Sequence, residues 1–175
     1  MSLLHQLMSR PVATGGRDEN TNTAIVPIGR GDPLVPRNDV LIAGAIVREL
    51  AENYPLRVLP PITVCGPVGP VGFGALALGA LLSGVYDSVA KSGVRSLVLV
   101  NAGEVDDDLV AVAREASAHG RRIEVFPTQR DWEAAYLSAQ GHRPPDEDPA
   151  GGAEKGRLIL SSLMRSFRSV SLKSG

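Results

Sequence analysis

The stretch "LVLVNAGEVDDDLVAVAREASAHG", residues 97–120, joins an apolar run to an amphipathic one. Its first four residues are branched aliphatic side chains, which is typical of a strand buried on both faces. An acidic turn follows, and then a helical period that ends at Gly120, a residue suited to closing a helix. A buried strand, a turn and a capped helix form the repeating unit of an α/β protein.

The same alternation continues on both sides of this unit. We expect a strand at Thr23–Gly29 and a helix at 39–55, whose apolar face is predicted to carry Leu41, Ile42, Ala45, Ile46 and Leu50. A second strand is expected at 56–64, a glycine-rich loop at 65–79 and a helix at 81–93. The remaining expected segments are strands at 94–101 and 121–128 and helices at 104–120, 131–141 and 157–167. This order predicts a three-layer α/β/α fold around a mostly parallel sheet.

The two ends of the chain differ from the alternating part. Residues 1–22 end in a polar, turn-forming stretch, so we expect a flexible N-terminal arm. Residues 166–175 carry two basic side chains, Arg168 and Lys173, and are predicted to form a solvated basic tail. The α/β domain is therefore expected to span residues 23–165.

Composition excludes several classes of protein. Apolar residues make up 43% of the chain, aromatic residues 4%, and the net charge at pH 7 is −1, so we expect neither nucleic acid nor an anionic membrane as a partner. No run of about 18 apolar residues is present, and we expect a cytoplasmic protein. The single cysteine, Cys65, leaves no internal disulfide and no zinc site made of several cysteines.

Three loops should meet where the parallel strands end, because ligands bind at the carboxyl edge of such sheets. The first holds Asp32 and Asp39, the second spans residues 66–74, and the third spans residues 101–108. Carboxylates there suit a hard divalent cation. The alternative is structural: Asp39 would cap a helix, and the acids at 106–108 would offset a helix dipole.

Two common nucleotide-binding motifs are missing from the glycine-rich loop. It contains no lysine, which a phosphate-binding Walker loop requires, and its glycines do not stand directly between a strand and a helix. The three histidines, His5, His119 and His142, lie outside the three loops. No serine stands on a sharp glycine-flanked turn, so a serine–histidine–aspartate triad is not expected.

A collinear set of segments resembles the creatininase (creatinine amidohydrolase) family, which includes the mycofactocin-associated creatininase-like peptidases. The family's first strand is followed by P-[IV]-G-S-T-E-Q-H-G-P-H-L-P-L-x-T-D, here "PIGRGDPLVPRND". Its P-P-[IL], G-F-x-G-T and N-G-H-G-G-N segments correspond here to "LPPITV", "VGFGALAL" and "NAGEVD". Its H-A-G-x-x-E-T-S corresponds to "PAGGAEKG".

This resemblance implies a site that has lost its histidines. Family enzymes hold two divalent metals with carboxylates and histidines. By position, the family's carboxylate ligands fall on Asp32, Asp39 and Glu154, whereas its N-G-H histidine falls on Gly103. Glu104 is the neighbouring carboxylate that would substitute. The remaining crevice residues would be Asn101, Asp106, Gly72 and Phe73.

Three functions follow from these observations. The first is a degenerate creatininase-like protein without catalytic activity, acting as a structural or regulatory subunit of a homo-oligomer or of a hetero-oligomer with an active paralogue, and holding no cofactor. The second is a metal-dependent amidohydrolase with a rebuilt carboxylate-rich site for Mn, Zn or Mg. The third is a small-molecule binding module that uses the same crevice. A zinc hydrolase relies on nitrogen or sulfur ligands and an open position for water, and this favours the first reading.

Overall fold

The computed structural model describes residues 22–31, 39–65, 75–103, 107–118, 120–141 and 156–164. Its strands are β1 (Thr23–Gly31), β2 (Arg57–Val58), β3 (Ile62–Cys65), β4 (Ser96–Asn101) and β5 (Ile123–Phe126). Its helices are α2 (Asp39–Asn53), α3 (Ala75–Ala90), α4 (Asp107–Ala118) and α5 (Gln129–Gln140), followed by a helix over 156–164. The alternation predicted from the sequence is confirmed.

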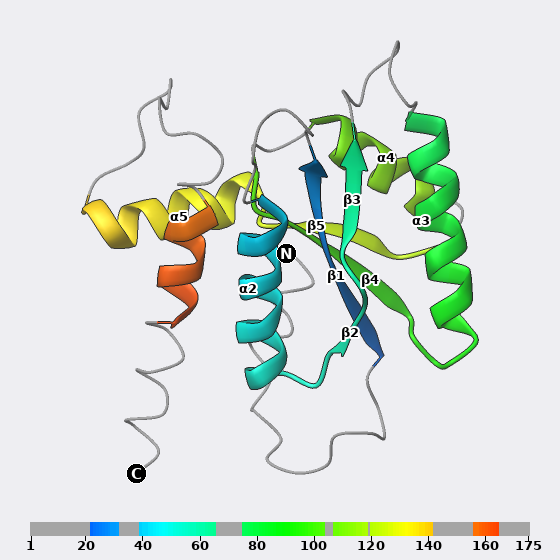
Figure 1. Cartoon of the computed structure of the whole chain (residues 1–175), viewed down its shortest axis with the longest axis horizontal. Helices are drawn as coiled ribbons and strands as arrows, with labels where there is room; N and C mark the ends of the chain where they lie inside the picture. Colours follow the sequence, from blue (N-terminus) through cyan, green and yellow to red (C-terminus); the bar gives the residue numbers. More distant parts are fainter. Residues whose placement is uncertain are drawn as a thin grey trace.

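The sheet is parallel throughout its described strands, with β1 inside it (Figure 1). One side of β1 pairs with β4, which in turn pairs with β5. The other side pairs with β2 near the start of β1 and with β3 near its end. Each connection between parallel strands needs a crossover, and helices supply it on both faces of the sheet.

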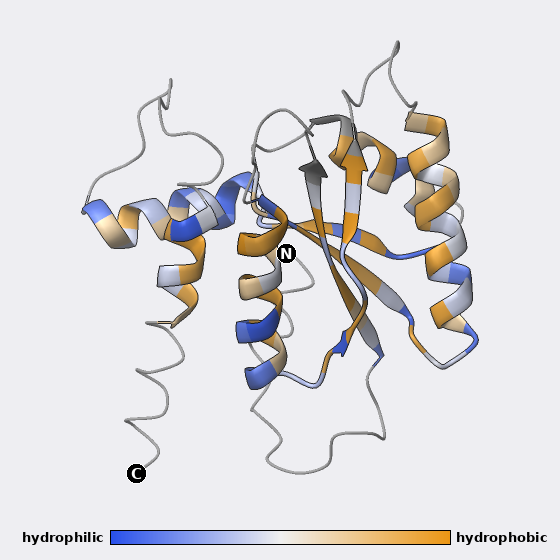
Figure 2. Ribbon diagram, in the orientation of Figure 1, coloured by the Kyte–Doolittle hydropathy of each residue, from blue (hydrophilic) through white to orange (hydrophobic). Residues whose placement is uncertain are grey.

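Alternate side chains of the strands feed two separate cores, because successive residues of a strand point to opposite faces. On one face Ile25, Val98 and Val100 pack with α2, α5 and the helix 156–164. On the other face the neighbouring strand residues pack with α3 and α4. Figure 2 shows the apolar colouring on the strands between these two helical layers. The predicted three-layer α/β/α architecture is therefore correct.

The predicted apolar face of α2 is only partly correct. Ile46 and Leu50 are buried, whereas Leu41 is 73% exposed. The buried face of this helix consists of Asp39, Ala43, Ile46, Val47 and Leu50. Residues 40–43 and 45–47 are all apolar, so their spacing alone does not fix which side of the helix meets the sheet.

Two other predicted elements have different bounds. The strand expected at 56–64 is two short strands, because Pro60 and Pro61 lack the N–H groups that a continuous ladder needs. The loop expected through residue 79 gives way to α3 at Ala75. Burial of Leu78 and Leu82 against the sheet outweighs the cost of a helical glycine at position 79, which is about 1 kcal/mol.

The helix ends follow the predicted capping rules. Gly93 and Gly120, predicted to close the helices before β4 and β5, have φ values of 86° and 82°, a region that glycine enters without strain. At the start of α5, Thr128 accepts a hydrogen bond from the Asp131 N–H, and Asp131 accepts one from the Thr128 N–H. This reciprocal capping box fixes where α5 leaves β5.

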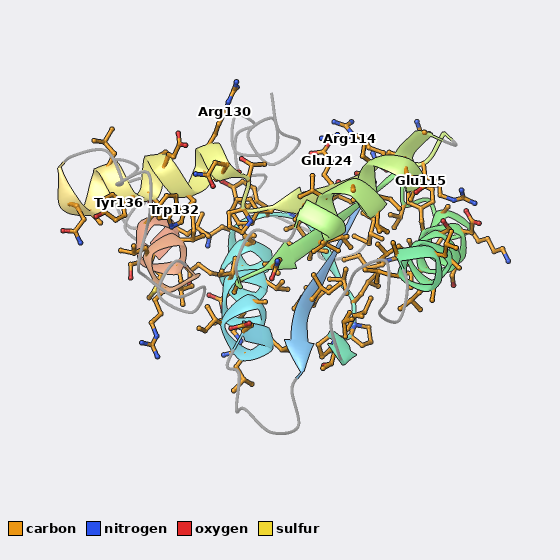
Figure 3. The ribbon with its side chains drawn as sticks, turned by 90° about the horizontal axis from the view of Figure 1, so that it is seen from above. Arg114, Glu115, Glu124, Arg130, Trp132 and Tyr136 are labelled. Carbon is orange, nitrogen blue, oxygen red and sulfur yellow. The ribbon has the colours of Figure 1, made fainter. Side chains whose placement is uncertain are left out.

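Helix α5 and the helix 156–164 together cover one end of the sheet. Trp132 and Tyr136 lie on the side of α5 that meets this last helix, with ring centroids 5.5 Å apart (Figure 3). Ile159 and Leu163 of the last helix belong to the same core. The final turn of the described chain is thus part of the domain. The arm predicted at 1–22 and the tail predicted at 166–175 lie outside the described residues, except for Asn22.

No helix within the described ranges is long and apolar enough to cross a membrane.

Candidate site at the carboxyl edge of the sheet

Strands β1, β3 and β4 end at the same edge of the sheet. Gly31, the last residue of β1, pairs with Cys65, the last residue of β3, and Asn101, the last residue of β4, pairs with Ile28. The three loops predicted to meet therefore begin beside one another. This edge is where a parallel sheet binds its ligands.

Helix α2 brings Asp39 to this edge. Asp39 is the first residue of α2 and is 8% exposed. Gly29 permits this position, because a Cβ atom at residue 29 would lie 2.6 Å from the Val40 Cγ2 atom and 3.0 Å from the Val40 nitrogen. Gly29 was not among the predicted site residues, although it belongs to the P-[IV]-G segment that follows the first strand.

Asp39, Asn101 and Gly103 form one cluster, here called the edge cluster. The Asn101 Oδ1 atom accepts a hydrogen bond of 3.0 Å from the Gly103 N–H. A Cβ atom added to Gly103 would lie 3.1 Å from Asp39 Oδ2 and 3.3 Å from Asn101 Oδ1. A carboxylate oxygen and an amide oxygen therefore lie in the space into which a side chain of residue 103 would extend.

The helix 156–164 closes the same edge from another direction. A Cβ atom at Gly156 would lie 2.8 Å from the Ala102 carbonyl oxygen and 2.9 Å from the Ile42 Cγ2 atom. Only glycine fits there without a shift of the backbone. Gly156 was not predicted as a site residue. The sequence offered one indication of a close contact there, which is that this glycine directly precedes the helix expected at 157–167.

The remaining predicted site residues are not placed by the structure. Asp32, Glu104, Asp106 and Glu154, with Gly72 and Phe73, lie outside the described residues. The structure thus brings together three of the predicted site residues, Asp39, Asn101 and Gly103.

The described residues of the edge cluster supply, by themselves, too few ligands for a zinc centre. It offers one carboxylate and one amide oxygen, and that oxygen already accepts the Gly103 N–H. Structural and catalytic zinc sites use three or four protein ligands. Within the described ranges, no three His, Cys, Asp or Glu side chains lie close enough together to hold a metal ion.

Comparison with known proteins identifies the class to which this fold and edge belong. The family model described as "Creatininase: Creatinine amidohydrolase" matches residues 6–168. The chain therefore belongs to the creatininase family, as the collinear segments predicted. No curated protein sequence matches the chain.

The solved structures that resemble this chain share little sequence with it. A structure described as "Creatininase Mn" has a TM-score of 0.46 and 15% identity, covering 87% of this chain and 90% of that one. A mutant creatininase of the "Zn-Zn type" has a TM-score of 0.49 and 16% identity over the same shares. A sigma-54 interaction domain protein from Enterococcus faecalis has a TM-score of 0.43 and 12% identity, covering 89% of this chain and 98% of that one.

Proposed function

We propose that the chain is a creatininase-family protein without amide-hydrolysing activity. In this proposal it holds no metal cofactor and serves as a structural or regulatory subunit. Its partners are further copies of itself or an active paralogue with the family's histidine motifs intact.

The environment of residue 103 carries the proposal. This position matches the histidine of the family's N-G-H motif, and here it is a glycine. The space beside it is occupied by the Asp39 carboxylate and the Asn101 amide. A side chain at this position would begin 3.1 Å from Asp39 Oδ2, so the carboxylate that, by the same resemblance, would be its fellow ligand would have to shift by a few tenths of an ångström.

The chemistry of amide hydrolysis supports the same conclusion. A metal hydrolase makes a nucleophile by lowering the pKa of a bound water to about 7, and a positioned base then moves the proton. In zinc enzymes the metal performs the first task while imidazole groups commonly hold it, and a histidine or a carboxylate moves the proton. Asp39 and Asn101 offer only oxygen atoms, which favour Mg²⁺ or Mn²⁺ with water completing the shell.

A metal-dependent amidohydrolase with a carboxylate-rich site is the competing function. The observation that favours it is the placement of Asp39, a carboxylate 8% exposed at the carboxyl edge. Such an enzyme would need Asp32, Glu104, Asp106 or Glu154 as further ligands, with Mn, Zn or Mg as the metal. A small-molecule binding module using the same crevice would need neither metal nor turnover.

The decisive experiment measures turnover and metal content together. The purified chain is loaded with Mn²⁺ or Zn²⁺ and assayed for hydrolysis of creatinine and simple amides, beside a creatininase that retains its histidines. We expect no turnover and less than one metal ion per chain by elemental analysis. Turnover by the chain that disappears in an Asp39→Ala variant would instead establish the amidohydrolase.

The subunit role has a separate test. Size-exclusion chromatography with light scattering gives the mass of the chain alone and after co-expression with a histidine-bearing paralogue. We expect a defined oligomer in at least one of these samples. A monomer in both samples would contradict this role if the protein concentration is about 100 times a micromolar dissociation constant, because assemblies of that affinity would then be formed.

A further inference from the structure

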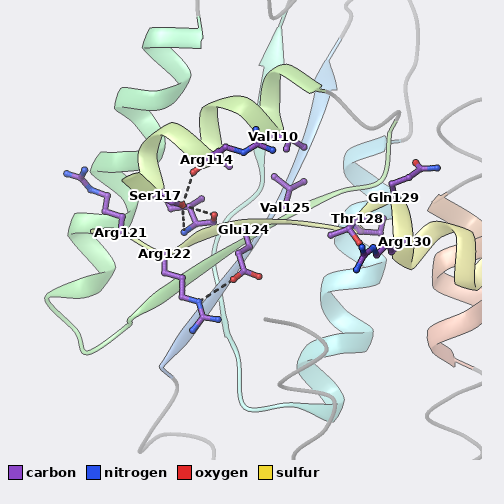
Figure 4. A pocket seen from close by; sticks show the side chains of 13 residues that line it. Val110, Arg114, Ser117, Arg121, Arg122, Glu124, Val125, Thr128, Gln129 and Arg130 are labelled. Atoms are coloured by element: carbon purple, nitrogen blue, oxygen red, sulfur yellow. Dashed lines mark hydrogen bonds and ion pairs between the residues drawn. The ribbon is translucent and has the colours of Figure 1, made fainter. Parts of the chain in front are cut away.

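A groove separate from the edge cluster runs beside β5, the last described strand of the sheet. It encloses about 770 Å³. Its walls come from α4, from β5 and the two residues before it, and from the start of α5 (Figure 4). We call it the β5 groove.

Positive charge is concentrated around the β5 groove. Four arginines and one glutamate line it, although the whole chain has a net charge of −1. Arg121 is held by a bidentate ion pair with Asp87, at 2.9 and 2.8 Å. The Arg122 Nε atom lies 3.2 Å from Glu124 Oε1.

Two further arginines in this groove are differently placed. Arg114 of α4 and Arg130 of α5 are exposed, and neither forms an ion pair with any other residue in the described part of the chain. They lie on different walls of the groove (Figure 4). Unpaired guanidinium groups suit carboxylates, which they bind through two parallel hydrogen bonds.

The backbone of β5 offers one open hydrogen-bonding position in this groove. The Arg122 carbonyl accepts a hydrogen bond from the Leu97 N–H of β4 at 2.8 Å. Because the backbone groups of successive residues in a strand point to opposite sides, those of Ile123 and Val125 point away from β4. They face the edge at which a further strand would pair.

The side chain of Ser117 lies against the backbone groups of Ile123 that point away from β4. Its hydroxyl oxygen accepts the Ile123 N–H at 3.1 Å and lies 2.9 Å from the Ile123 carbonyl oxygen (Figure 4). No such side chain lies at Val125 among the described residues. Within the described part of the chain, the N–H and C=O of Val125 are therefore open to a ligand.

Apolar side chains also line the β5 groove, among them Val110 and Ala113 of α4 and Val125 of β5. An apolar lining, an open strand position and two arginines on different walls match a short peptide that carries acidic side chains at intervals. Such a peptide would pair its backbone with Val125, as in binding by strand addition.

We propose that the β5 groove binds an acidic peptide segment of a partner protein, laid in an extended conformation along β5. Arg114 and Arg130 bind its carboxylates, and Val125 pairs with its backbone. The inference rests on the proposed function in one respect, since a subunit without turnover acts by binding. It names the surface and the chemistry of the partner.

Fluorescence anisotropy with defined peptides tests this proposal on the full chain. The probe is a fluorescein-labelled Glu-Val-Glu-Val-Glu-Val peptide. Two control peptides replace Glu by Lys, or carry N-methyl groups on alternate backbone nitrogens. The test variant is Arg114→Glu/Arg130→Glu. Its matched control is Arg48→Glu/Arg157→Glu, which makes the same charge change at two exposed arginines elsewhere.

We expect saturable binding of the acidic peptide that weakens about tenfold in the test variant and less than twofold in its control. The lysine and N-methyl peptides should bind more weakly than the probe. No binding, equal loss in both double variants, or equal binding of the lysine or N-methyl peptide would overturn the proposal. Amide hydrolysis is measured on the same preparations. Turnover would contradict the proposed function, whereas the peptide-binding result would still decide whether the β5 groove binds acidic peptides.

Discussion

The edge cluster and the β5 groove use their polar groups in opposite ways. In the edge cluster, Asp39 and Asn101 are turned toward Gly103 and fill the space beside it. In the β5 groove, Arg114 and Arg130 stand on separate walls of an open cavity of about 770 Å³. In the described part of the chain, the carboxyl edge is closely packed around residues 103 and 156, whereas exposed arginines line an open groove beside β5.

The close approach of Gly156 to a backbone oxygen gives the largest expected effect. Gly156→Ala places a Cβ atom 2.8 Å from the Ala102 carbonyl oxygen, so the backbone must move, and we expect a loss of about 2 kcal/mol in the free energy of unfolding. Urea denaturation measures it.

Gly84→Ala is the matched control for that substitution. Nothing lies within 4 Å of a Cβ atom at Gly84 of α3, and removing a helical glycine should stabilise the chain by about 0.5–1 kcal/mol. If both substitutions stabilise the protein, the edge is looser than the structure indicates.

Loss of the Ser117 hydroxyl is expected to be next in size. Ser117→Ala leaves the Ile123 N–H without its acceptor and removes the single hydroxyl donor that lies 2.8 Å from the Ala113 carbonyl and 2.9 Å from the Ile123 carbonyl, which costs about 1–2 kcal/mol. Ser88→Ala, at an exposed position of α3, should change the free energy of unfolding by less than about 0.5 kcal/mol. Equal effects from the two serines would show that β5 does not depend on this hydroxyl.

The contact between Gly103 and Asp39 predicts an energetic coupling of about 1 kcal/mol. Alanine at position 103 should cost more when Asp39 is present than in an Asp39→Ala background, because its Cβ atom meets the carboxylate at 3.1 Å. A double-mutant cycle of Gly103→Ala and Asp39→Ala, followed by thermal unfolding, measures this difference. Additive effects would mean that the carboxylate moves aside without cost.

The smallest expected effect comes from the ion pair at the far end of the β5 groove. The hydrogen bond from Arg121 lowers the pKa of Asp87 below its usual value of about 3.9, although Asp87 is exposed. A lowered pKa stabilises the folded chain above the unfolded-state value, and this contribution is lost as the pH falls through the folded-state value.

Asp87→Asn should therefore lower the midpoint of thermal unfolding slightly at pH 7 and not at pH 2. Salt should reduce the difference at pH 7, because exposed charges are screened. The same decrease at both pH values would assign the effect to something other than the charge of Asp87.

Most of the fold could be predicted from the sequence because most strands lie in short apolar runs and most of the helices end at glycine. The exceptions have identifiable physical causes. The unbroken apolar stretches of α2 hide which face is buried, and the glycines of α3 hide a helix that tertiary packing stabilises. The paired prolines divide a strand that reads as continuous by hydropathy alone.

The two binding regions were predictable to different degrees. The edge cluster could be predicted from the carboxyl-edge rule together with the family resemblance, which pointed to Asp39, Asn101 and Gly103. The close approach of Gly156 could not, because it depends on how the last helix packs. The β5 groove was not foreseen, since Arg114 and Arg130 are 16 positions apart in the sequence and only their separate helices bring them to one cavity.

The hydroxyl of Ser117 also bears on whether β5 can serve as an open strand edge. An open strand edge is a template on which further chains assemble into fibrils, and natural proteins commonly block such edges. Because Ser117 already bonds to the backbone of Ile123, only Val125 of β5 can pair with an added strand. One residue is too few for a continuous ladder of hydrogen bonds. We therefore expect this small side chain of α4 to hinder polymerisation through β5 while leaving Val125 open.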